Sequence, residues 1–119
     1  MYKFTMDFNM GRGAIANLSD IFNNYGVPST IIEIGVFEGS TTFWLSDNLT
    51  PHNPNLKIYA IDPHVGSNDM TEDFTDVRNN FINNLLVNQN KNVEYIQKHS
   101  KDGLIELINK GVKIGRAHV

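Results

Sequence analysis

The chain has 119 residues and a formal net charge of -3, with 40% apolar and 19% charged residues. This length fits one domain, and the composition is typical of a soluble globular protein. The acidic balance disfavours a nucleic-acid partner, because phosphate binding is driven by lysine and arginine. The absence of cysteine excludes disulfides, thiolate metal sites and a cysteine nucleophile.

Targeting and membrane signals are not found. The N-terminal residues lack an apolar run followed by a small-residue cleavage site, and no stretch reaches the roughly 18 apolar residues of a membrane span. We therefore expect a cytoplasmic protein with no membrane partner. Residues 114–119 (IGRAHV) resemble the translation of a sequencing adapter, so we expect a native region over 1–113 and a non-native tail over 114–119.

Helix and strand signals alternate along the chain. Apolar residues at helical spacing predict a first helix over 14–25, which Gly26 and Pro28 end. Short β-branched or alternating runs predict strands, and helical periodicity returns after each of them. The predicted strands are 30–34, 56–62 and 93–97, and the other predicted helices are 41–47, 71–88 and 104–108.

This order predicts an α/β fold, a Rossmann-like parallel sheet with right-handed crossovers. Ligands of such sheets bind beyond the carboxyl ends of the strands. In this chain those ends fall at 35–40, 62–67 and 99–101. We therefore look for the functional site in these three segments.

The first strand runs into Glu33-x-Gly35-x-x-x-Gly39-Ser40. The two glycines allow a sharp turn and a close approach of the backbone to a ligand. A helix that starts at Ser40, capped by its hydroxyl, offers N–H groups to a carboxylate or a phosphate. On spacing alone, a plain strand-to-helix turn is an equal alternative. Phe37 and Glu38 lie inside the turn, and we expect their side chains to face the ligand.

Asp62 closes the second strand, 23 residues after Gly39. Nucleotide-binding folds place an acidic residue about 20 residues further on, where it can accept both hydroxyls of a ribose. A capping or loop aspartate is the alternative interpretation. His64 and Asp69 share the loop with Asp62, but two potential ligands do not make a metal site, and none is predicted.

His99, Ser100 and Lys101 follow the third strand, where an adenine ring could lie. Ser100 is also a good helix cap, which is the alternative for this segment. A dinucleotide fingerprint would read Gly-x-Gly-x-x-Gly, but here Val36 and Phe37 leave little room for a pyrophosphate. A ligand with a ribose, an adenine and a carboxylate but no phosphate fits better, and S-adenosylmethionine is such a ligand.

Three segments, EIGVFEGSTTFWL, IDPHVGS and VEYIQKHSKDGLIEL, resemble successive motifs of the class I S-adenosylmethionine-dependent methyltransferases. The sequence is most similar to the subfamily labelled methyltransferase family 24, akin to the catechol O-methyltransferase type, over about Phe4 to Lys110. The resemblance implies the first three strands of that fold, truncated before the fourth. It also implies an enzyme as the full-length parent and an inactive fragment, with the methyl acceptor and the catalytic residues unknown.

The resemblance also implies roles for individual residues. Glu33 would order the turn and reach the methionine amino group. The expected cofactor-binding residues are Glu33, Gly35, Phe37, Gly39 and Ser40 at the methionine end, Asp62 at the ribose, and His99 or Ser100 at the adenine. Two other functions remain open: an NAD-binding oxidoreductase fragment, which the bulky turn disfavours, and a non-catalytic α/β interaction module that binds no nucleotide.

The resemblance finally implies that the first strand is central in the complete fold. A chain without the fourth strand leaves 30–34 as an unpaired apolar edge. Such an edge is a template for pairing with another chain. We therefore expect self-association through this edge.

Overall fold

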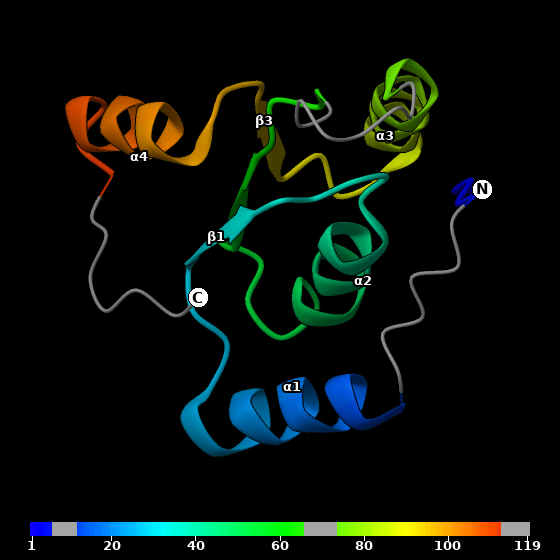
Figure 1. Ribbon diagram of the computed structural model, residues 1–119. Coiled ribbons are helices and arrows are strands. Elements are labelled where there is room, and N and C mark those ends of the chain that lie inside the picture. The colour runs from blue at the N-terminus through cyan, green and yellow to red at the C-terminus, as the bar shows by residue number, and fades with distance from the viewer. Residues whose placement is uncertain (6–11, 66–73, 113–119) are drawn as a thin grey trace.

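The computed structural model describes residues 1–5, 12–65 and 74–112 (Figure 1). Helices and strands alternate along this part of the chain, as the sequence predicts. The elements are α1 (Arg12–Tyr25), β1 (Thr30–Ile34), α2 (Ser40–Leu49), β2 (Lys57–Ile61), α3 (Thr75–Val87), β3 (Val93–Ile96) and α4 (Ser100–Asn109).

The three strands form one parallel sheet in the order β1-β2-β3. Thr30 pairs with Lys57 in β2, and Ile58 pairs with Val93 in β3. The carboxyl ends of the strands therefore meet at one edge of the sheet. The predicted Rossmann-like α/β fold is confirmed, and within the described residues β1 is an edge strand.

The two faces of the sheet are covered by different helices. Phe43 of α2 and Phe81 of α3 pack with Ala60 on one face. Leu107 of α4 packs with Ile61 on the other face, because successive strand residues point to opposite sides. α2 and α3 thus share a face, and α4 crosses to the opposite one. Phe22 of α1 contacts a third cluster, which includes Ile58, Leu45 and Leu49.

Some predicted helix ends differ from the structure. The helix predicted over 71–88 begins at Thr75, and 71–73 lie outside the described residues, as do 114–119. α4 starts at Ser100 rather than 104, because its polar first turn carries no apolar periodicity. The predicted Ser40 cap is wrong: Gly39 is the cap residue and no side chain caps α2. His99 rather than Ser100 stands at the cap position of α4.

None of the helices in the described part of the chain combines the length and the apolar character that crossing a membrane requires.

Candidate functional site at the carboxyl edge

Residues 35–39 turn sharply between β1 and α2. Gly35, Phe37 and Gly39 all have positive φ, at 77°, 52° and 88°. A Cβ on Gly39 would lie 2.3 Å from a ring carbon of Phe43, so the packing requires glycine as much as the backbone angle does. At Gly35 nothing lies within 4 Å of the same position. The turn is closed against the core at Gly39 and open at Gly35, where a ligand can approach the backbone.

The carboxylate of Asp62 holds this turn. Its Oδ2 accepts hydrogen bonds from the backbone N–H groups of Val36 (2.9 Å) and Phe37 (3.1 Å). Its Oδ1 accepts the N–H of His64 at 2.8 Å. Asp62 therefore joins the end of β2 to the turn that follows β1. A ribose hydroxyl would share the carboxylate with these donors, and the ribose contact stays a prediction.

The hydrogen bonds to Asp62 determine which charge a ligand group meets at the turn. In phosphate-binding turns, free backbone N–H groups point at the anion. Here the N–H groups of Val36 and Phe37 already point at a carboxylate, and that of Gly39 donates to Val36 O at 2.8 Å. A phosphate placed against Val36 and Phe37 would meet negative charge instead of free donors. This part of the turn therefore suits a neutral or cationic ligand group, whereas the uncapped N-terminus of α2 next to it can face a carboxylate.

Glu33 lies in β1 beneath the turn. Its Oε2 accepts a hydrogen bond from the Thr42 hydroxyl at 2.6 Å. Burial, helped by the negative charge of Asp62 and opposed by the Thr42 hydrogen bond, raises the pKa of Glu33 to about 7. A carboxyl group that titrates near neutral pH is an effective partner for a cation, because an incoming positive charge stabilises its ionised form.

His64 was not predicted as a site residue, yet it supports the turn. Its ring is buried, with Nε2 2.6 Å from Phe37 O and Nδ1 2.5 Å from the Tyr95 hydroxyl. A carbonyl only accepts, so Nε2 donates its proton to Phe37 O, and the Tyr95 hydroxyl holds the other ring nitrogen. Burial raises the pKa of Tyr95, and a hydrogen bond with Arg78 opposes that rise. The positive φ of Phe37 is thus stabilised from β3.

Glu38 does not face the ligand as expected. Its side chain is 3% exposed and accepts hydrogen bonds from Thr5 and Asn80, away from the open side of the turn. Phe37 is half-buried and its ring lies 6.2 Å from that of Phe74. The expectation for Glu38 fails because an N-terminal segment, remote in sequence, supplies its donors.

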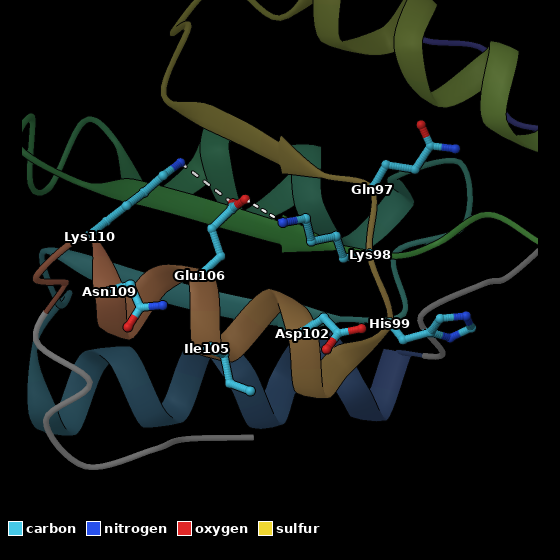
Figure 2. Close-up of a pocket in the computed structure, with 8 residues that line it drawn as sticks. All are labelled: Gln97, Lys98, His99, Asp102, Ile105, Glu106, Asn109 and Lys110. Carbon is cyan, nitrogen blue, oxygen red and sulfur yellow. Dashed lines mark hydrogen bonds and ion pairs between the residues drawn. The ribbon is translucent and has the colours of Figure 1, made fainter.

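The predicted adenine residues lie beside a different hollow. His99 and Ser100 are exposed, and His99 borders a shallow hollow of about 650 Å³ along α4 (Figure 2). Figure 2 shows Lys98 and Lys110 approaching Glu106 from either side, with ion-pair distances of 2.8 and 3.5 Å. The charged groups of Lys98, Glu106 and Lys110 pair with one another, and the hollow contains none of the turn residues 35–40. The glycine turn is the stronger candidate.

The sequence gives only weak indications that His64 and Tyr95 support the glycine turn. Tyr95 stands at an inward position of an alternating strand, and His64 follows Asp62 by two residues. Among the described residues, no group of three His, Asp or Glu side chains could hold a metal ion. Asp69, considered together with His64, lies outside the described residues.

Comparisons with family models, with curated proteins and with solved structures give no match for this chain. The methyltransferase resemblance therefore rests on the motifs alone. The site is interpreted below from its own geometry.

Proposed function

We propose that the chain binds S-adenosylmethionine at the carboxyl edge of the sheet and forms the cofactor-binding part of a methyltransferase. The observation that carries this proposal is the Asp62 carboxylate seated on the N–H groups of the glycine turn. It favours a cationic, phosphate-free ligand over a dinucleotide. S-adenosylmethionine has both properties, since it carries a sulfonium and an ammonium group.

The surrounding groups support the same ligand. Glu33 offers a buried carboxyl beneath the turn for the ammonium group. The first turn of α2 has no side-chain cap, so its N–H groups remain available to the methionine carboxylate. Gly35 leaves the space through which the ligand reaches both. The opposite charges of the amino-acid end are thus matched within one turn.

When bound, this cofactor supplies a methyl group on sulfur, and the bond to sulfur breaks as the bond to the acceptor forms. The residues described here bind and orient the cofactor. We propose no catalytic residue among them. The transfer itself is proposed for the full-length parent.

Isothermal titration with S-adenosylhomocysteine, S-adenosylmethionine and NAD tests the proposal directly. We expect both sulfur ligands to bind and NAD to bind at least about tenfold more weakly, since its pyrophosphate meets Asp62. Tighter binding of NAD would favour the oxidoreductase alternative. Binding of none of the three would favour an interaction module.

Substitution of Asp62 tests the assigned role of this carboxylate. Asp62→Ala leaves the N–H groups of Val36 and Phe37 without their acceptor, and we expect the affinity for S-adenosylhomocysteine to fall by about 1.5–3 kcal/mol. Asp62→Asn keeps one acceptor oxygen and should lose less. Equal affinity of the wild type and both variants, measured by the same titration, would remove Asp62 from the site.

A further inference from the structure

The first five residues contact α2 through Tyr2 and α3 through the backbone of Lys3. Lys3 N–H donates to Asn84 Oδ1 at 2.8 Å, and Asn84 Nδ2 donates to Lys3 O at 2.9 Å. One side-chain amide thus pairs with both polar groups of a single residue. Because only the backbone of Lys3 takes part, this contact recognises an extended peptide and not a particular side chain.

Tyr2 anchors one end of this segment. Its ring stacks on Phe43, with the ring centroids 4.9 Å apart. Its hydroxyl donates to Asp47 at 3.1 Å and accepts from Asn88 Nδ2 at 2.9 Å. The aromatic ring and the hydroxyl are therefore both bound by the walls of the groove between α2 and α3.

Thr5 holds the other end, at the glycine turn. Its N–H donates to Glu38 Oε1 and its hydroxyl donates to Oε2, both at 2.8 Å. Asn80 Nδ2 also donates to Oε2, at 2.6 Å, and Asn84 Nδ2 donates to the backbone carbonyl of Glu38 at 3.0 Å. Glu38 lies next to Gly39, which rests on the same Phe43 ring that Tyr2 covers. The segment is therefore linked to the turn in two ways, by hydrogen bonds to the Glu38 carboxylate and by packing on the Phe43 ring.

The lining of this groove contains buried amide groups, some of which residues 1–5 bind. Asn80, Asn84 and Asn88 are four residues apart and lie on one face of α3, and Asn84 and Asn88 are each 1% exposed. Buried amides cost free energy unless they are hydrogen-bonded. Asn88 also bonds to Ser46 and Lys91, but the acceptor oxygen of Asn84 is bound by the backbone N–H of Lys3. The buried Asn84 amide therefore indicates a surface suited to a peptide backbone.

We propose that the groove between α2 and α3 is a binding site for an extended peptide, occupied by residues 1–5 of this chain, and that its occupant sets the conformation of the glycine turn. Glu38 is the positioning residue that links the two. This inference concerns the free protein and does not depend on the identity of the cofactor.

Hydrogen exchange of the backbone amides of residues 36–40 tests the link. Thr5→Pro removes the N–H and the hydroxyl that bind Glu38, and we expect these amides to exchange about tenfold faster or more. Lys3→Ala is the matched control, because only the backbone of Lys3 is bound, and exchange should not change. The amides of β3 report whether the fold is intact. Equal exchange in the two variants would overturn the link.

If Thr5→Pro also accelerates exchange in β3, Thr5→Val replaces it, because it removes the hydroxyl bond alone. A smaller but selective acceleration at 36–40 is then expected, and an acceleration of equal size in β3 would contradict the proposal.

A peptide added in trans tests the groove itself. The synthetic peptide MYKFT, added in excess to a chain that carries both Tyr2→Ala and Thr5→Pro and so binds its own N-terminal segment weakly, should restore slow exchange at 36–40. A control peptide that carries Tyr2→Ala and Thr5→Pro should not. Failure of MYKFT to restore protection would overturn the assignment of the groove as a peptide site. No cofactor is present in these measurements, so failure to bind S-adenosylmethionine would leave their result unaffected.

Discussion

Two carboxyl groups at the carboxyl edge have unequal surroundings. Asp62 accepts three backbone N–H groups, whereas Glu33 accepts one hydroxyl group and is largely buried. Burial therefore raises the pKa of Glu33 from 4.5 to about 7. The folded chain binds this proton more tightly than the unfolded chain does, so stability falls as the pH rises from 4.5 to 7.

Glu33→Gln should remove this loss. The pKa shift of Glu33 corresponds to about 3 kcal/mol of folding free energy. The folded protein loses this full amount of stability above pH 7 and none of it below pH 4.5, the pKa in the unfolded chain. We expect the variant to gain up to that amount over the wild type at pH 8 and to match it near pH 4.5, measured by urea unfolding. If the difference in unfolding free energy between Glu33→Gln and the wild type does not change with pH, the raised pKa of Glu33 is contradicted.

The same ionisation should appear in cofactor binding. An ammonium group next to Glu33 requires the carboxylate, so affinity for S-adenosylhomocysteine is expected to rise as the pH increases through about 7. Titrations at pH 6 and pH 7.5 measure this, and Glu33→Gln should abolish the rise. If the stability difference is found without the binding difference, Glu33 is buried as described but does not contact the amino group.

At the scale of elements, the sequence predicted every strand and helix of the described chain, because burial on a sheet imposes a period of two and on a helix one near 3.6. It did not predict the asparagine face of α3. In the sequence, Asn84 and Asn88 are two polar residues of low helix propensity within a polar stretch. Their hydrogen-bond partners, Lys3 and Ser46, lie far away in the chain. The inward position of Glu38 was missed for the same reason. Long-range hydrogen bonds leave no periodic trace in a sequence.

The β1–α2 turn gives a prediction about glycine. Gly39→Ala places a methyl group against the buried Phe43 ring, which Tyr2 and Phe81 hold at centroid distances of 4.9 and 5.6 Å. We expect a loss of about 2–4 kcal/mol in the free energy of unfolding, from the left-handed backbone and the overpacking together. Gly35→Ala has a similar φ but open space, so it should lose only about 1–2 kcal/mol. Urea unfolding of both variants checks the difference, and equal losses would show that the close contact costs nothing.

At the scale of the whole molecule, the described residues leave β1 as an edge strand with a neighbour on one side only. Gly35 N–H and Ser29 O bond to β2, so alternate residues of β1 direct their backbone groups away from the sheet. Ile34 at the end of the strand is 47% exposed. An apolar edge of this kind favours pairing with another chain.

Sedimentation velocity over a range of concentrations should therefore show association of the wild-type chain. Ile34→Lys should reduce it, because a charged edge residue disfavours strand pairing. Ile105→Lys is the control, since Ile105 is equally exposed at 45% but lies on α4. A monomer that remains monodisperse at all concentrations would exclude association through β1, and an equal effect of the two lysines would assign it to general apolar exposure.

The position of the glycine turn at the edge of the sheet has a consequence for ligand exchange. Within the described residues β1 is the edge strand, so β2 and β3 build the wall on one side of the turn. Binding sites usually cover about 70–90% of a small ligand, and a single wall cannot do so. The described residues alone should therefore release a bound ligand quickly, since differences in affinity lie mostly in the rate of dissociation.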